Sequence, residues 1–237
     1  MGAMPRPSFV LEQNNATGTV SYWEAGENQS VADAAGVSLA DYVHAMYFFI
    51  RKAGARRVLM IGCGGGTLAT MLHRTGAEVT VVDVSARAFE IARRYFALPA
   101  AIACHVADGR AFLARSPVRY DAIALDAYDG DTIPRQFLKP DFFALARSRL
   151  RPRGIFAMNI IVADDRDRTP DRIGRAAQRS FRHVRLLDSD GWIDRNAVLI
   201  AGAVAGLTRP RLLLKPKRRA RRLAREIRDL DFRPLRD

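Results

Sequence analysis

Short apolar runs alternate with amphipathic segments along most of this chain. Apolar runs that leave no room for polar side chains predict buried strands, and they lie near 57–62, 77–83, 101–106, 121–126 and 154–160. Segments with helical spacing lie near 67–75, 86–96, 109–115, 140–150 and 169–180. This alternation predicts an α/β fold, a doubly wound, mostly parallel sheet with helices on both faces. Two further apolar segments, 183–188 and 196–203, predict an antiparallel C-terminal hairpin that brings the sheet to seven strands.

The N-terminal part follows a different pattern. Residues 8–35 predict a short N-terminal β-region, because strand-like runs flank turn signals at Asn14–Gly18 and Ala25–Gly26. A helix is expected to begin at Ser38, with Asp41 three residues later as its capping pair.

The C-terminal part is strongly basic. Residues 208–237 hold twelve Lys or Arg against four Asp or Glu, a net charge of +8 out of the chain's +13. Apolar residues recur there at helical spacing, which predicts a basic amphipathic helix; they are Ala220, Leu223, Ala224, Ile227 and Leu230. We expect the apolar stripe to dock on the rest of the protein. A weak, salt-sensitive attraction to polyanions is the alternative use of the charge.

Composition narrows the class of protein. A chain of 237 residues, 49% of them hydrophobic, can bury the core of an ordinary domain. No apolar run approaches the length needed to cross a bilayer, and residues 1–13 hold no apolar signal segment, so we expect a cytoplasmic protein with no membrane contact. We expect no metal, because the four histidines share no metal-ligand spacing.

A glycine loop follows the first strand of the alternating pattern. Gly62, Gly64 and Gly66 let the backbone pass close to a ligand, and the next strand ends in Asp83. A carboxylate at the tip of that strand can accept hydrogen bonds from both hydroxyls of a ribose. The loop and Asp83 together predict a nucleoside-containing cofactor. The third glycine comes one residue earlier than in the dinucleotide fingerprint, and this shorter form is similar to the first motif of the S-adenosylmethionine-dependent methyltransferase fold.

Carboxylates follow the next two strands as well. Asp108 comes after the third strand, and Asp126 and Asp129 come after the fourth. Ligands of open α/β sheets bind at the carboxyl ends of the strands, so these side chains are expected to meet Asp83 at one edge of the sheet. Capping the following helix is an alternative role for Asp108.

Asp126-Ala-Tyr-Asp129 resembles the D-x-x-D element of the spermidine synthases, the polyamine aminopropyltransferases. Gln29-Ser30, Tyr42-Val-His44 and Asp108-Gly109-Arg-Ala-Phe112-Leu113 are also similar to segments of that family. The likeness covers roughly residues 20–160.

The resemblance implies an enzyme that moves an aminopropyl group from decarboxylated S-adenosylmethionine to an amine. It implies a small-molecule amine substrate, no metal, and a homodimer as a possible assembly. The implied roles are Asp126 as general base, Asp129 as the amine's ion partner, Tyr42, Gln29 and His44 lining the amine site, Gly62, Gly64 and Gly66 beside the donor, Asp83 on its ribose, and Asp108 with Gly109 at its adenine. The chain then divides into an N-terminal β-region (1–37), a catalytic domain (38–207) and a basic tail (208–237).

This sequence also departs from the family's pattern. Spermidine synthases carry an aspartate in the glycine loop that binds the donor's terminal ammonium, whereas Cys63-Gly-Gly-Gly66 holds no carboxylate. The N-terminal β-region is short, and His44 stands one place later than the family's histidine. Two alternatives therefore stay open. One is a methyltransferase that uses S-adenosylmethionine itself, and the other is a non-catalytic domain that binds a nucleoside or a partner.

Overall fold

The computed structural model describes residues 9–24, 26–204 and 206–236. A larger sheet contains β4 (Arg57–Ile61), β5 (Glu78–Asp83), β6 (Ala103–Val106), β7 (Tyr120–Leu125), β8 (Leu150–Val162), β9 (Val184–Asp188), β10 (Arg195–Gly202) and β11 (Asp231–Arg233). A smaller sheet contains β1 (Phe9–Asn14), β2 (Thr19–Glu24) and β3 (Glu27–Asp33). The helices are α1 (Asp41–Lys52), α2 (Thr67–His73), α3 (Ala86–Tyr95), α4 (Gly109–Arg115), α5 (Pro140–Arg149), α6 (Thr169–Gln178) and α7 (Ala220–Asp229), with a 3₁₀ turn, η1, at Arg135–Phe137.

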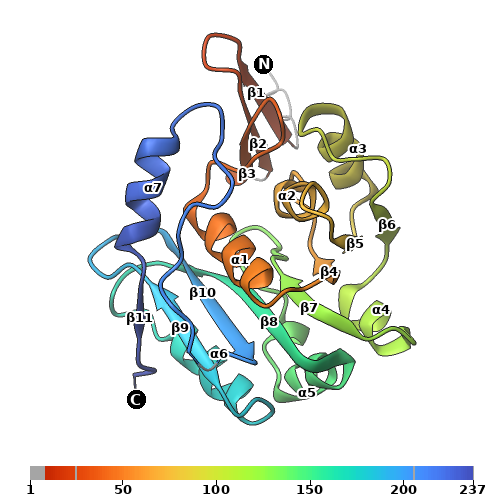
Figure 1. Cartoon of the computed structure of the whole chain (residues 1–237), viewed down its shortest axis with the longest axis vertical. Coiled ribbons are helices and arrows are strands. Elements are labelled where there is room, and N and C mark those ends of the chain that lie inside the picture. The colour runs from red at the N-terminus through yellow and green to blue at the C-terminus, as the bar shows by residue number, and fades with distance from the viewer. Residues whose placement is uncertain (1–8, 25, 205, 237) are drawn as a thin grey trace, which may run out of the picture.

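The larger sheet has the strand order β11-β9-β10-β8-β7-β4-β5-β6. Within this order, the neighbours β8, β7, β4, β5 and β6 run parallel to one another. Strand β10 pairs antiparallel with both β8 and β9. One core holds side chains of α1, α2 and α3, and a second holds side chains of α4, α5 and α6. Figure 1 shows where these helices lie along the sheet. The predicted α/β fold, a doubly wound sheet with an antiparallel C-terminal hairpin, is confirmed.

The register of the parallel strands brings their carboxyl ends to one edge. Ile61 at the end of β4 pairs with Val82 of β5 and with Leu125 of β7. The residues that follow these positions are Gly62, Asp83 and Asp126, so the strand pairing alone places the glycine loop between two carboxylates.

In the part of the chain that the structure describes, the larger sheet has eight strands, and the prediction of seven is wrong. The additional strand, β11, pairs antiparallel with β9 and forms the edge that the hairpin was expected to close. Three residues are too few to show a strand periodicity. Contacts with distant residues hold β11: its backbone pairs with β9, and the side chain of Arg233 binds Asp188 at the end of β9.

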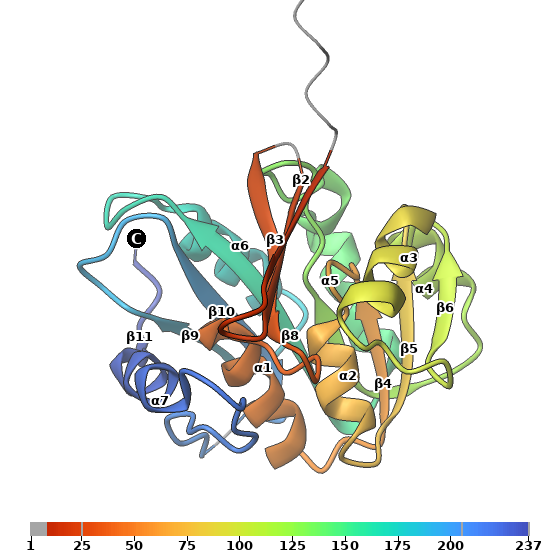
Figure 2. The ribbon, with the colours of Figure 1, turned by 90° about the horizontal axis from the view of Figure 1, so that it is seen from above.

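Helix α7 lies on the same side of the sheet as α1 (Figures 1 and 2). Leu223 and Ile227 are at most 1% exposed, and Leu230 just after the helix is also 1% exposed. The apolar stripe of the basic segment is therefore buried, while the charged residues of α7 remain on the outside.

Helix α1 begins at Asp41, and the capping pair expected from Ser38 does not form. Ala40 occupies the N-cap without a side-chain hydrogen bond to the helix. The backbone of Ser38 instead forms a bridge to Ala32 of β3, and its hydroxyl accepts a hydrogen bond from the amide of Ala40. Pairing with β3 keeps Ser38 extended, so the helix begins three residues later.

The smaller sheet packs on α3 and reaches the glycine loop. Val20 and Tyr22 of β2 share a core with Ile91 of α3. On the other side, the hydroxyl of Ser30 in β3 accepts a hydrogen bond of 2.7 Å from the amide of Gly65. Figure 2 shows this sheet between the α7 end and the α3 end of the molecule. Within the described residues, no helix has the length and apolar character that crossing a membrane requires.

Candidate active site

The glycine loop is pressed between the end of β7 and strand β3. Gly62 has a φ of +92°, and a Cβ there would lie 2.0 Å from the carbonyl oxygen of Asp126. A Cβ on Gly64 would lie 2.9 Å from the carbonyl oxygen of Gln29. Glycine is therefore needed at both positions for the chain to pass. Gly66 forms the N-cap of α2 and does not line the cavities described next.

Two cavities open at this edge of the sheet. A small cavity of about 380 Å³ is bordered by Gly62, Asp83 and Asp108, and a large cavity of about 850 Å³ by Tyr42 and Asn159. The residues that line both are Gln29, Gly64, Asp126, Tyr128 and Gly130. A ligand in one cavity can thus meet a ligand in the other at Asp126.

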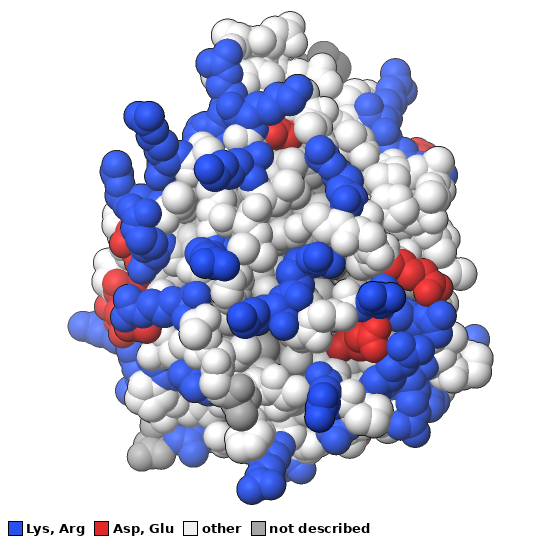
Figure 3. Space-filling view, in the orientation of Figure 1, with Lys and Arg blue, Asp and Glu red and all other residues white. Residues whose placement is uncertain are grey.

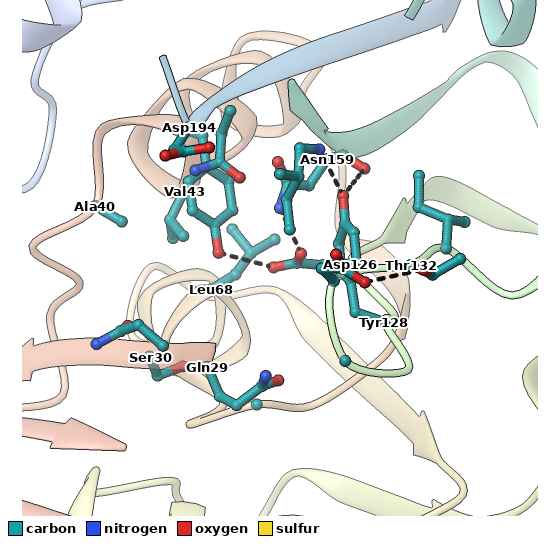
Figure 4. A pocket seen from close by; sticks show the side chains of 18 of the residues that line it. Gln29, Ser30, Ala40, Val43, Leu68, Asp126, Tyr128, Thr132, Asn159 and Asp194 are labelled. Carbon is teal, nitrogen blue, oxygen red and sulfur yellow. Dashed lines mark hydrogen bonds between the residues drawn. The ribbon is translucent and has the colours of Figure 1, made fainter. Parts of the chain in front are cut away.

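Asp126 is held in place by two donors. The amide of Asn159 donates a hydrogen bond of 2.9 Å to one carboxylate oxygen, and the hydroxyl of Tyr42 donates one of 3.3 Å to the other. Figure 4 shows Asp126 beside Asn159 and Tyr128, with Gln29 and Ser30 across the cavity. Burial raises the pKa of Asp126, and the hydrogen bonds from Asn159 and Tyr42 offset only part of that rise. A fixed carboxylate of raised proton affinity is suited to accept a proton.

Tyr128 links the loop that carries Asp126 to strand β8, which carries Asn159. Its hydroxyl donates a hydrogen bond of 3.0 Å to the carbonyl of Asn159 and accepts one of 2.9 Å from the amide of Ile161. These bonds tie the loop after β7 to the end of β8, so the position of Asn159 relative to Asp126 is fixed.

Asp83 lines the small cavity. Its two oxygens accept hydrogen bonds from the backbone amides of Cys63 (2.7 Å) and Ser85 (2.8 Å), and burial raises its pKa. Each oxygen keeps a further lone pair for a ligand hydroxyl. A second carboxylate, Glu24, also lines this cavity and accepts a hydrogen bond of 2.5 Å from the hydroxyl of Tyr22.

Asp108 caps a helix and also lines the small cavity. One carboxylate oxygen caps α4 by accepting a hydrogen bond of 2.7 Å from the amide of Ala111. The other accepts one of 3.0 Å from the side-chain amide of Gln136 in η1. Asp108, Gly109 and Gln136 all line the small cavity.

The structure does not bring two predicted amine-binding residues into the large cavity. Asp129 is exposed and lines the small cavity, because a turn that pairs its backbone with Thr132 carries it to that side. His44 lines neither cavity; it is 1% exposed, and its Nε2 lies 2.8 Å from the carbonyl oxygen of Ser38. Gln29 and Tyr42 do line the large cavity.

Sequence reasoning missed several cavity residues. Asn159 is the clearest, and a signal existed, since it is the one polar side chain in the apolar run from Ile155 to Val162 of β8. Asp131 and Asp194 also line the large cavity, but they lie in polar loops, where an aspartate by itself indicates nothing.

The lining of both cavities is acidic. Among the described residues, eight lining side chains are acidic and one, Arg172, is Lys or Arg. The acidic ones are Glu24, Asp83, Asp108, Asp126, Asp129, Asp131, Asp167 and Asp194. In a protein of net charge +13, this concentration favours a cationic ligand. No group of three or more His, Cys, Asp or Glu in the described part is arranged to hold a metal ion.

Comparison with known families matches residues 58–154 to a methyltransferase domain. A "Probable polyamine aminopropyl transferase" of Bifidobacterium longum is 36% identical over 113 residues, which cover 47% of this chain and 25% of that protein. An "eEF1A lysine and N-terminal methyltransferase homolog" of Drosophila pseudoobscura pseudoobscura is 30% identical over 128 residues, 48% of this chain and 19% of that protein. The chain thus spans a quarter or less of these two relatives.

Solved structures resemble a larger part of the chain. A probable spermidine synthase from Corynebacterium glutamicum superposes with a TM-score of 0.76 at 19% identity, covering 96% of this chain and 87% of the other. A spermidine synthase in complex with the transition state analogue AdoDATO gives 0.62 at 17% identity, covering 81% and 68%. The chain therefore resembles the polyamine aminopropyltransferases in sequence and has their fold, and the relatives named here are transferases.

Proposed function

We propose that this protein transfers an aminopropyl group from decarboxylated S-adenosylmethionine to an amine, with Asp126 as the general base. The observation that carries the proposal is the position of Asp126, which lines both cavities. In this proposal the small cavity holds the donor, with its ribose on Asp83 and its adenine beside Asp108, and the large cavity holds the amine.

The chemistry requires a base at this point. The amine nitrogen attacks the methylene carbon next to the sulfonium, the carbon–sulfur bond breaks, and its electron pair leaves with sulfur as a neutral thioether. The attacking nitrogen must give up a proton, and an amine with a pKa near 10 holds that proton at neutral pH. The raised pKa of Asp126 brings its proton affinity closer to that of the amine, which favours this transfer.

The acidic lining of the two cavities supports decarboxylated S-adenosylmethionine as the donor and an amine as the acceptor. The sulfonium, the donor's ammonium and the amine are all cationic, and eight acidic side chains line the two cavities. Asp126 also lies where the donor's reacting end would meet the amine. A carboxylate on the donor would face acidic side chains there, so the decarboxylated donor is favoured.

A mass-spectrometric assay with 1,4-diaminobutane and either donor tests the proposal. We expect 5′-methylthioadenosine to form from the decarboxylated donor, and Asp126→Asn to lower its rate of formation by about 10³-fold. Asp141→Asn is the matched control, because Asp141 is exposed on α5 and pairs with Arg110 away from the cavities. Turnover by Asp126→Asn at the control's rate would refute the role of Asp126.

A methyltransferase is the second candidate. The observations in its favour are the match of residues 58–154 to a methyltransferase domain and the absence of a carboxylate from the loop Cys63–Gly66. Calorimetry with the two donors separates the candidates. Preference for S-adenosylmethionine, with S-adenosylhomocysteine as the product, would favour methyl transfer.

A further inference from the structure

The C-terminal segment carries a surface that the proposed transfer does not use. Eight of its basic side chains are exposed and form no ion pair with an acidic residue in the ranges 9–24, 26–204 and 206–236. We name them the C-terminal basic surface: Arg211, Lys215, Lys217, Arg218, Arg219, Arg221, Arg225 and Arg228. None of them lines either cavity.

Helix α7 orients part of this surface outward. Arg221, Arg225 and Arg228 are spaced four and three residues apart, so they lie on one face of the helix. Leu223 and Ile227 lie on the opposite face and are buried against the body of the protein. Docking of the apolar face therefore fixes a row of guanidinium groups toward solvent. Figure 3 shows many Lys and Arg and few acidic side chains on the side of the molecule that carries α7.

The first turn of α7 adds to the positive potential. Arg219 is the N-cap, Arg221 and Arg222 follow in the first turn, and no acidic residue is there. The N-terminus of a helix carries a partial positive charge, which disfavours cations and favours anions. The repulsion between these arginines and the helix N-terminus is unfavourable in the free protein, and a bound anion reduces this repulsion.

We propose that the C-terminal basic surface binds the phosphate backbone of duplex nucleic acid without reading its sequence. Six of the eight residues are Arg, whose guanidinium binds phosphate through two hydrogen bonds. Single strands need aromatic side chains for base stacking, and residues 208–230 hold no Phe, Trp or Tyr. A membrane surface is disfavoured as well, since Leu213 is the one large hydrophobic residue exposed in the described part of this segment.

Fluorescence anisotropy with a labelled DNA duplex of mixed sequence tests the proposal on the full chain. Raising the salt from about 50 mM to about 200 mM is expected to weaken binding by roughly 10³-fold, as six or so phosphate contacts require. The variant Arg221→Gln/Arg225→Gln/Arg228→Gln is expected to bind at least about tenfold more weakly at low salt, with a salt slope smaller by about 3. Its formation of 5′-methylthioadenosine should stay unchanged.

A second triple variant provides the matched control. Arg115→Gln/Arg119→Gln/Arg147→Gln removes the same charge from exposed positions on and near α4 and α5. Equal weakening by both triples would show a diffuse charge effect and overturn the proposal. So would an absence of duplex binding by the wild type at low salt, or binding to anionic lipid vesicles in preference to the duplex. Because binding is read without turnover, failure of the proposed enzymatic function leaves this test intact.

Discussion

Two pairs of aspartates differ in their counterions. Asp83 and Asp126 face the cavities, accept hydrogen bonds from neutral donors, and have pKa values raised by burial. Asp171 of α6 and Asp188 of β9 lie near the end of the strand order that β11 and β9 form, and they are 2% and 3% exposed. Burial alone would raise their pKa values too, but hydrogen bonds from arginines outweigh it and lower both.

The second group forms what we name the C-terminal ion cluster, which consists of Asp171, Asp188, Arg195 and Arg233. Arg233 of β11 lies 2.9 Å from Asp188 and 2.8 Å from Asp171, and Arg195 lies 2.8 Å from Asp188. Here the protein supplies the cations itself. Asp83 and Asp126 accept hydrogen bonds from neutral donors instead, and their carboxylates remain available for a cation from outside. In these two pairs, an arginine partner distinguishes the aspartates of the ion cluster from those that line the cavities.

Replacing the central cavity aspartate should give the largest effect. Asp126→Asn is expected to lower kcat by about 10³-fold, the usual contribution of a general base, with donor affinity changed by less than about threefold. Because the folded state raises the pKa of Asp126, its ionised form costs folding free energy above that pKa, so near neutral pH the variant should be no less stable than the wild type. Steady-state kinetics and thermal melting check both parts. A large loss of stability would place Asp126 among the structural aspartates.

Breaking the ion cluster should act on stability instead. Arg233→Met leaves Asp171 and Asp188 without their shared cation, and Arg233 has a side chain only 9% exposed, so we expect a loss of about 3–5 kcal/mol. Urea unfolding measures it, and Arg228→Met, at an exposed position outside the cluster, is the control.

The pH dependence of this effect has a definite sign. Carboxyls with lowered folded-state pKa values contribute stability above their unfolded pKa of about 3.9, and lose it as pH falls through the folded value. The wild type should therefore lose more stability on acidification than Arg233→Met. Parallel declines would show that Arg233 does not set the pKa values of Asp171 and Asp188.

The same contrast shows what the sequence could predict. The apolar runs predicted β4, β5 and β7 because most of their residues are buried, and Asp83 and Asp126 were predicted because they lie at or directly after the carboxyl ends of such strands. Strand β11 was missed because its three residues show no local pattern and are held by long-range contacts, among them the ion pair of Arg233 with Asp188. No signal in a single sequence couples Arg233 to Asp171, 62 residues earlier.

The sequence also did not predict which cavity Asp129 lines. Asp129 follows Asp126 by three residues, yet the turn that pairs it with Thr132 carries it to the small cavity. The roles of the site residues, the domain boundaries, the homodimer and the cytoplasmic location stay predictions.

Removing the hydrogen bond that Asn159 donates to Asp126 should have an effect of intermediate size on turnover. Asn159→Leu deletes a hydrogen bond that lowers the pKa of Asp126, so the pKa should rise further and the acid limb of the kcat/KM profile should move to higher pH. Loss of a hydrogen bond to a charged group should also lower kcat by roughly tenfold. Thr132→Val, at an exposed position on the large cavity, is the control. An unmoved acid limb would mean that Asp126 is not the group whose ionisation limits the rate.

The smallest effect comes from giving a cavity aspartate the counterion that it lacks. Gln136 donates a neutral hydrogen bond to Asp108, and Gln136→Lys places an ammonium there instead. If an unpaired carboxylate is what admits the ligand, calorimetry should show 5′-methylthioadenosine bound roughly tenfold more weakly by Gln136→Lys. Thermal stability should be nearly unchanged, because an ion pair with the exposed Asp108 contributes little. Gln136→Ala removes the donor without adding charge and should change the affinity by less than about threefold. Equal affinities for Gln136→Lys and the wild type would show that a cation beside the carboxylate does not exclude the ligand, and the distinction between the two groups of aspartates would then not extend to Asp108.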